Sequence, residues 1–315
     1  IKMSKNEEDP CIYHAHFNEG CAFIILYVDD VLIIAEHIER TEKIMTTLYD
    51  RFNIKEVKDL SYYLGMSLTM PEERDWIHMS QPIAITKMLE KFDLSGAKPT
   101  KSPQSPSTMI TKRTDEEKTD QSRYRSAIGI LLWIARCTRP DIIFTVSLLA
   151  QQQSDPSVEH WGAVIHTMRY LAGTANHGIA IGPFEKGLIA TKVNSDSSYC
   201  DPQRNLFSTS GMVITIGDSP VAWSSKRQSL HAQSSAEAEY IACGSAAKEG
   251  IWINRFLRSI VNKVPHRLSF PFILVTDSDS CRKMIERGAP DHGRTKHIEL
   301  RHHFIIEHHA KKDFT

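Results

Sequence analysis

Hydrophobic residues in the first third of the chain occur in short β-branched runs, which is the pattern of buried strands. Residues 21–28 form one such run, Asp29 and Asp30 interrupt it, and residues 31–35 resume it. This pattern predicts a hairpin with two acidic residues at its tip. The next predicted elements are a helix with Ile38, Ile44, Met45 and Leu48 at helical spacing, a strand pair over 60–69 and 76–79, and a helix over 83–92.

The middle of the chain contains a polar segment that is followed by three predicted helices. Residues 96–123 are rich in Lys, Ser, Thr, Pro and charge, which predicts a linker or an exposed loop. Helices are predicted over 124–136 and over 138–153, the second with Pro140 in its first turn. Asp155-Pro156 repeats this device at the start of a third helix, which is predicted to end near Gly173.

From residue 189 onward the pattern becomes β-β-β-α-β-α. Strands are predicted over 189–195, 210–216, 220–225 and 270–276, and helices over 236–260, 278–287 and 298–309. Strands that feed helices in this order predict a mixed sheet covered by helices, so the fold class is α/β (α+β). Four segments follow from these patterns, with bounds 1–95, 96–123, 124–185 and 186–315.

Composition narrows the picture only slightly. Thirty-eight basic residues balance thirty-eight acidic ones, so any basic surface for a nucleic acid must be a local patch. The longest apolar runs, 21–28 and 127–135, are shorter than the ~20 residues of a bilayer span, which predicts no membrane partner. Six cysteines without a C-x-x-C pair predict reduced thiols inside a cell. The chain begins with Ile1, which predicts a piece of a longer polyprotein.

Three carboxylates occupy positions that suit chemistry. Asp196 and Asp277 lie at the ends of predicted strands, where ligands of mixed α/β sheets collect, although Asp277 could instead cap the helix that follows. On the long helix two glutamates compete. Ser234 and Glu237 have capping-box spacing, whereas Glu239 has no such role and lies beside the face that should pack on the sheet. Asp196, Glu239 and Asp277 could therefore meet.

A cluster of this kind needs a cation. Neighbouring carboxylates repel one another unless positive charge neutralises them. Hard oxygen ligands suit Mg²⁺ or Mn²⁺, and two such ions about 4 Å apart can activate water and stabilise the leaving oxygen of a phosphodiester. The spacing of the acids alone does not single out a nuclease. His302, His303, His308 and His309 are not spaced to share one helix face, which favours a partly exposed helix over a metal site.

The residues around the acids are more specific than their spacing. The segments Ser195-Asp-Ser-Ser-Tyr, Ser208-Thr-Ser-Gly, Ala222-Trp-Ser-Ser-Lys-Arg-Gln, Ser234-Ser-Ala-Glu-Ala-Glu-Tyr, Ala246-Ala-Lys-Glu-Gly and Thr295-Lys-His-Ile-Glu resemble, in order, the ribonuclease H (RNase H) domain of copia-type retrotransposons. The resemblance implies that Asp196, Glu239 and Asp277 are catalytic metal ligands that cut the RNA strand of an RNA–DNA hybrid. After Asp196 the family often has Ala-Asp-Trp, where this chain has Ser-Ser-Tyr.

The N-terminal part resembles the reverse transcriptase of the same family. Tyr27-Val-Asp-Asp is similar to its active-site hairpin, and Tyr62-Tyr-Leu-Gly-Met, Leu89-Glu-Lys-Phe, Thr138-Arg-Pro-Asp and Arg169-Tyr-Leu-Ala-Gly-Thr are similar to the stretches that follow. The resemblance implies a partial palm and thumb over 1–95, a linker over 96–123, a helical connection over 124–185 and an RNase H-like domain over 186–315 that is incomplete at its C-terminus. It also implies that Asp29 and Asp30 are metal ligands for DNA synthesis from template RNA, a DNA primer and deoxynucleotides.

The resemblance implies further expectations for partners and activity. Lys226, Arg227, Arg294, Lys296 and Arg301 are candidates for phosphate contacts, with an ordinary solvated surface as the alternative. The parent element would be intracellular, in a cytoplasmic virus-like particle and the nucleus. The family's third polymerase Asp and fourth RNase H acid have no counterpart here, so these residues alone are not expected to polymerise, and RNA cleavage stays open. The alternative is an inactive, truncated or decayed copy that binds nucleic acid without turnover.

Overall fold

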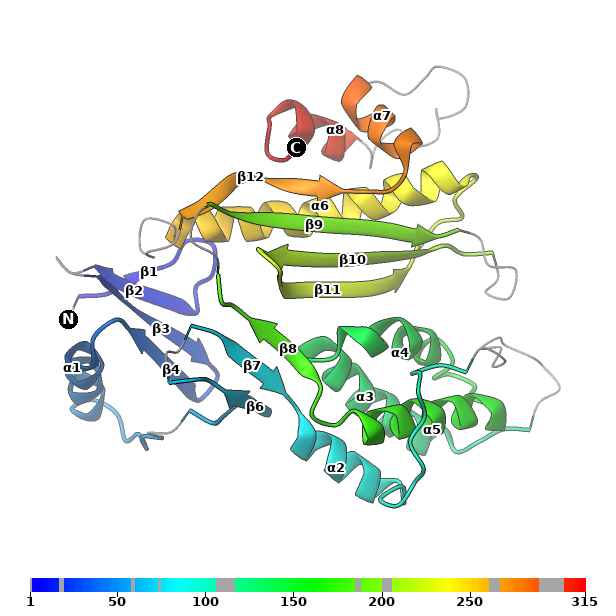
Figure 1. Cartoon of the computed structure of the whole chain (residues 1–315), viewed down its shortest axis with the longest axis horizontal. Coiled ribbons are helices and arrows are strands. Elements are labelled where there is room, and N and C mark those ends of the chain that lie inside the picture. The colour runs from blue at the N-terminus through cyan, green and yellow to red at the C-terminus, as the bar shows by residue number, and fades with distance from the viewer. Residues whose placement is uncertain are drawn as a thin grey trace.

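The structure is a computed structural model and describes residues 2–16, 20–57, 60–72, 75–105, 117–184, 188–199, 206–260, 267–288 and 303–315. Within these residues the elements form three four-stranded sheets and several helices, so the predicted mixed α/β class is confirmed. One sheet with its helix lies beside the N-terminus, a helical layer lies below the third sheet, and the C-terminus lies next to α8 (Figure 1). No helix in the described ranges is long and apolar enough to cross a membrane.

The first sheet contains the predicted acidic hairpin. Its strands, in spatial order, are β1 (Ser4–Lys5), β2 (Ile12–His16), β3 (Cys21–Tyr27) and β4 (Asp30–Ala35). The neighbouring strands are all antiparallel, and α1 (Ile38–Tyr49) covers one face through the buried Ile44. Ile38 was predicted on the apolar face of this helix but is 73% exposed, because it is the first helical residue.

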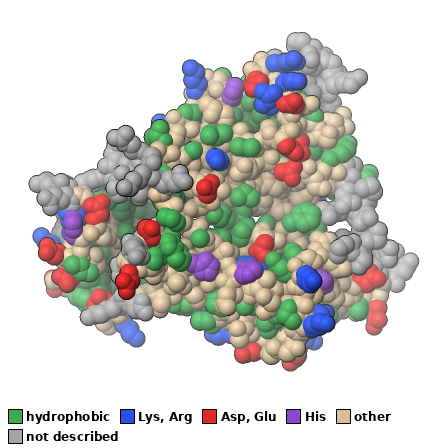
Figure 2. All heavy atoms as spheres, in the orientation of Figure 1, with side chains coloured by type: hydrophobic (Ala, Val, Ile, Leu, Met, Phe, Trp, Pro, Cys, Tyr) green, Lys and Arg blue, Asp and Glu red, His purple; other side chains and the backbone are tan. Residues whose placement is uncertain are grey.

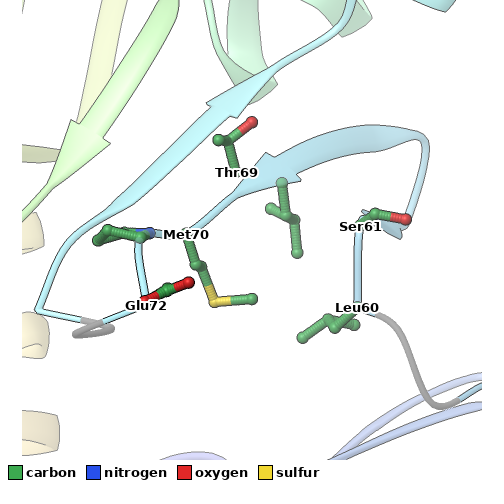
Figure 3. Close-up of a pocket in the computed structure, with 7 residues that line it drawn as sticks. Leu60, Ser61, Thr69, Met70 and Glu72 are labelled. Carbon is green, nitrogen blue, oxygen red and sulfur yellow. The ribbon is translucent and has the colours of Figure 1, made fainter.

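The second sheet joins segments that are far apart in the sequence. Its strands, in spatial order, are β5 (Tyr62–Tyr63), β6 (Met66–Thr69), β7 (Ile77–Ser80) and β8 (Gly178–Ile181). The strand predicted over 60–69 is in fact two strands, because Leu64 and Gly65 both take positive φ and reverse the chain. The segment 124–185 is not wholly helical, since β8 pairs antiparallel with β7. A cleft of about 500 Å³ opens beside β6 (Figure 3).

Helices from both sides of the predicted linker share one core. They are α2 (Pro82–Lys91), α3 (Gln121–Cys137), the short 3₁₀ turn η1 (Pro140–Ile142), α4 (Ile143–Ala150) and α5 (Val158–Gly173). Their apolar faces bury Met88, Tyr124, Ile128, Leu131 and Met168 almost completely. Fully burying side chains of this size stabilises a fold by roughly 1.5–3 kcal/mol each.

Two details of this region differ from the sequence predictions. The helix predicted over 138–153 is divided between η1 and α4. The third helix does not carry Pro156 in its first turn, because α5 starts after Ser157, whose hydroxyl accepts the N–H of His160 at 3.2 Å. The side chain of His160 in turn accepts the N–H of Ser157, which completes a capping box.

The described part of the predicted linker is not a free loop. Residues 96–105 run along α5, where the backbone N–H of Thr100 donates to the carbonyl of Arg169. The hydroxyl of Thr167 donates to the carbonyl of Pro103 at 3.0 Å. The polar composition of this stretch therefore reflects hydrogen bonding to a helix rather than full exposure. Residues 106–116 lie outside the described part.

The third sheet is the predicted mixed sheet. Its strands, in spatial order, are β11 (Ser219–Arg227), β10 (Thr209–Ile216), β9 (Leu188–Ser198) and β12 (Arg267–Val275). β10 is antiparallel to both β11 and β9, whereas β12 is parallel to β9. The long helix α6 (Ser235–Ile260) lies along this sheet, and α7 (Asp279–Arg287) and α8 (His303–Ala310) lie beyond it (Figure 1).

The core between α6 and this sheet is tightly packed. Val193 and Phe272 are fully buried on the strands that α6 covers. Gly250 lets the helix approach, since a Cβ there would lie 2.8 Å from side-chain atoms of both residues. The C-terminal residues add a short edge that the sequence did not predict: Thr315 donates to the carbonyl of Phe272 and accepts the N–H of Leu274. This packing fixes the helix that carries Glu239.

Candidate metal centre

Three carboxylates from separate elements converge at one end of the third sheet. Asp196 belongs to β9, Asp277 follows β12 by two residues, and Glu239 lies in the first turns of α6. Because β12 runs parallel to β9 with Val275 opposite Asn194, both aspartates reach the same edge. One oxygen atom from each of the three side chains lies within 4.8 Å of the others.

Glu239 is the innermost of the three acids. Its side chain is only 9% exposed, whereas Asp196 and Asp277 are exposed. The Oε1 atom of Glu239 accepts the backbone N–H of Ser197 at 3.2 Å and the Ser197 hydroxyl at 2.7 Å. The Oε2 atom is buried and has no hydrogen-bond partner. A buried carboxylate oxygen without a donor is costly, so this atom favours a ligand.

The electrostatic surroundings of Glu239 also favour a bound cation. Burial raises the pKa of Glu239, the hydrogen bonds from Ser197 oppose that rise, and the charges of Asp196 and Asp277 add to it. A cation placed among the three carboxylates would lower this pKa, because it favours the ionised form. The charge arrangement is therefore one that a bound metal ion relieves.

The structure assigns the two capping roles to other residues. Glu237 accepts the backbone N–H of Gln233 at 2.7 Å, and its own N–H donates to Ser234 Oγ at 3.2 Å. Glu237 therefore serves the start of α6, as its spacing predicted, although it bonds Gln233 rather than the N-cap amide. Ser278 caps α7 by accepting the N–H of Cys281 at 3.2 Å. Asp277 is not the cap and stays available to the cluster.

The donor set fits a hard divalent cation. Three carboxylates supply oxygen ligands, and the exposure of Asp196 and Asp277 leaves open positions for water or substrate oxygens. Asp196, Glu239 and Asp277 are the group of three or more potential ligands found in the described residues. The cleft of Figure 3, in contrast, has Glu72 as its one acidic lining residue and is not a metal site of this kind.

The second pair of predicted acids lies apart, on the hairpin of the first sheet. Asp29 and Asp30 are both exposed, and Tyr27 pairs with Asp30 where β3 passes into β4. Val28, which follows Tyr27 in this turn, is 90% exposed and has φ 53°, an unusual value for a β-branched residue. The hydroxyl of Tyr63 is buried, and its pKa is raised by burial and by the charge of Asp30.

Of the basic residues predicted to contact phosphates, two lie in the described part of the chain. Lys226 and Arg227 end β11, opposite Ser210 and Thr209, near the end of the sheet that carries Asp196. The Arg227 guanidinium lies 4.8 Å from the centroid of the Phe207 ring, a cation–π distance. The other candidates lie outside the described residues: Arg294, Lys296 and Arg301. Positive and negative side chains are interspersed on the face shown in Figure 2.

Two polar residues near the site were not singled out by the sequence. Ser197 hydrogen-bonds Glu239, and its only sequence signal is its place next to Asp196. Gln228 is 5% exposed and donates to Ser210 Oγ and to the carbonyl of Ala238, both at 2.9 Å. It thereby ties β10 to the first turn of α6, one residue before Glu239. The free thiols of Cys243 and Cys281 are also buried near this turn.

Comparison with known proteins relates this chain to one family and several relatives. Residues 1–106, which include the aspartate hairpin, match the family described as "Reverse transcriptase (RNA-dependent DNA polymerase)". The chain is 33% identical over 313 residues to the retrovirus-related Pol polyprotein from transposon TNT 1-94 of Nicotiana tabacum, an alignment that covers 96% of this chain and 23% of the relative.

Two relatives from Arabidopsis thaliana give the same result. The Pol polyproteins from transposons RE2 and RE1 are 31% and 30% identical, over 94% and 97% of this chain and 20% of each relative. The chain is therefore homologous to the Pol polyproteins of copia-type transposons, and its residues 1–106 match the reverse transcriptase family. It spans about a fifth of the length of these curated relatives.

Proposed function

We propose that Asp196, Glu239 and Asp277 form an RNase H site that hydrolyses the RNA strand of RNA–DNA hybrids with Mg²⁺ or Mn²⁺. The observation that carries this proposal is the convergence of three carboxylate oxygens within 4.8 Å around the buried, unpartnered Oε2 of Glu239. The resemblance of the surrounding segments to copia-type RNase H supports the choice of substrate.

The residues would divide the work by their exposure. Asp196 and Asp277 are exposed, so they would hold metal ions on the side from which a nucleic-acid strand approaches. Glu239 would hold the same ions from the protein side. Bound divalent ions activate a water molecule and stabilise the leaving oxygen in phosphodiester hydrolysis. Lys226 and Arg227, near the same sheet end, would contact phosphates without reading sequence.

Hybrid specificity would come from the substrate's own chemistry. The 2′-hydroxyl marks the RNA strand, and the shape of the hybrid differs from that of a DNA duplex. We therefore expect cleavage of the RNA strand of a hybrid and no cleavage of a DNA–DNA duplex of the same sequence.

For the parent polyprotein we propose RNA-templated DNA synthesis with Asp29 and Asp30 as metal ligands. The match of residues 1–106 to the reverse transcriptase family supports this role, and both carboxylates are exposed at the hairpin tip. Template RNA, a DNA primer and deoxynucleotides would be the partners.

An end-labelled RNA–DNA hybrid tests the RNase H proposal directly. The chain is incubated with the hybrid and Mg²⁺ or Mn²⁺, beside Asp196→Asn and the matched control Asp218→Asn. Asp218 is an exposed acid in the turn between β10 and β11, at the other end of the same sheet. We expect metal-dependent RNA cleavage that Asp196→Asn abolishes and Asp218→Asn retains.

Two outcomes would contradict the proposal. Cleavage that survives Asp196→Asn would come from another site or a contaminant. A folded protein that binds the hybrid but never cuts it would support the alternative function, nucleic-acid binding without turnover.

A further inference from the structure

A single residue supplies both hydrogen bonds to the inner acid of the metal centre. Ser197 offers its backbone N–H at 3.2 Å and its hydroxyl at 2.7 Å, and both reach the same atom, Oε1 of Glu239. Glu239 Oε2 has no hydrogen-bond partner although it is buried. The two oxygens of this carboxylate therefore have unequal surroundings.

This inequality orients the carboxylate. Two donors on one oxygen fix the plane of the group and occupy that oxygen's lone pairs. Hydrogen bonds to an ionised acceptor are shorter and roughly twice as strong as neutral ones, and the hydroxyl contact at 2.7 Å is the shorter of the pair. The free oxygen, Oε2, is then the atom left for a metal ion.

We propose that Ser197 is a positioning residue of the metal centre: its hydroxyl holds Glu239 so that Oε2 faces the ion shared with Asp196 and Asp277. The inference rests on the proposed metal site and assigns a residue outside the three ligands. Residues that orient metal ligands typically change metal affinity by about 10–100-fold when they are removed.

Direct metal binding tests this role without any nucleic acid. Metal-stripped protein is titrated with Mn²⁺ by calorimetry, for the original chain and for Ser197→Ala, Ser197→Thr and Ser198→Ala. Ser198 is the neighbouring, exposed serine on the same strand and serves as the matched control. We expect Ser197→Ala to raise the Mn²⁺ dissociation constant about tenfold or more.

The conservative variant separates positioning from a general structural effect. Ser197→Thr keeps the hydroxyl and should bind Mn²⁺ within about threefold of the original chain, as should Ser198→Ala. Ser197→Cys has nearly the volume of serine but a weak donor, so it should lie between Thr and Ala. This series also keeps the test decisive if the alanine variant does not fold.

The outcomes distinguish the two proposals. If the original chain binds Mn²⁺ in a manner that Asp196→Asn abolishes, yet Ser197→Ala binds equally tightly, the positioning role is wrong and the metal site stands. Failure of Thr to restore binding overturns the role of the hydroxyl in the same way. If the original chain shows no Asp196-dependent binding, the metal site itself is refuted, and the role of Ser197 with it.

Discussion

Replacing Glu239 by glutamine should stabilise the metal-free protein while it abolishes the response to metal. Glutamine retains an oxygen that can accept both hydrogen bonds from Ser197. It removes a negative charge that is 9% exposed and lies beside Asp196 and Asp277. The substitution therefore relieves repulsion and burial of charge without deleting volume.

The magnitude follows from the separation of the charges. Two unit charges 4.8 Å apart interact by about 1 kcal/mol in water and about 3.5 kcal/mol at an effective dielectric constant near 20. Because both aspartates are exposed, the smaller figure applies to each pair. We expect the free energy of unfolding of Glu239→Gln in EDTA to exceed that of the original chain by about 1–2 kcal/mol.

Metal should reverse this order. A ligand at 100 times its dissociation constant stabilises a folded protein by about 2.7 kcal/mol. The original chain should gain this stability in Mg²⁺, whereas Glu239→Gln should gain little. The pH dependence carries the same sign: because the pKa of Glu239 is raised, its ionisation opposes folding, and stability in EDTA falls as pH rises through that pKa. Glu239→Gln should lack this fall.

Urea unfolding followed by circular dichroism, with EDTA or with saturating Mg²⁺, measures all of these quantities. Glu237→Gln is the control, because it removes the same charge two residues earlier on the same helix. It should lose about 0.5 kcal/mol near the helix N-terminus and keep the full Mg²⁺ response. A Glu239→Gln protein that is less stable in EDTA, or that still gains stability from Mg²⁺, would refute the reasoning.

Four further predictions concern buried, acidic and basic residues. Arg139 is 1% exposed and donates two hydrogen bonds to Asp141, so Arg139→Lys should lower the unfolding free energy by about 2–4 kcal/mol in urea titrations. Burial alone would raise the pKa of Asp141, but the Arg139 guanidinium lowers it. The ionised Asp141 therefore adds stability that is lost as pH falls through its lowered pKa. Asp141→Asn should remove this loss and so flatten the acid side of a plot of unfolding free energy against pH. Gly250→Ala should cost about 1–3 kcal/mol in the same unfolding assay through overpacking. The double substitution Lys226→Gln with Arg227→Gln should weaken binding to the RNA–DNA hybrid. It should also reduce the slope of log affinity against log salt concentration by the equivalent of up to about two phosphate contacts. Fluorescence anisotropy at several salt concentrations measures both.

Elements with a strong local pattern were predictable from the sequence. The aspartate hairpin and α6 follow from an interrupted apolar run and a long helical stretch, and the structure has both. In contrast, β8 is four residues long, and its partner β7 lies about a hundred residues earlier in the chain. A strand that owes its existence to so distant a partner leaves little periodic signal.

In the candidate site, too, local features were predictable and contacts between distant elements were not. Helical geometry favoured Glu239 over Glu237 because Glu237 had a capping role, and the structure gives Glu237 that role. The hydrogen bonds of Ser197 depend instead on how far β9 extends and on the distance between β9 and α6. Neither quantity is contained in a local pattern, so a serine next to the first aspartate carried no visible signal.

The topology of the third sheet explains why three distant acids meet. Parallel strands cannot be joined by a tight turn, so the chain must cross over between β9 and β12, and α6 is the helix of that crossover. Both strands then end at one edge, and the helix that makes the parallel pairing possible also begins at that edge. One inserted residue before Glu239 would rotate its side chain by about 100° and leave both aspartates in place. The register of α6, fixed by Gln228 at its first turn and by the close packing at Gly250, is therefore a structural variable on which the proposed metal centre depends.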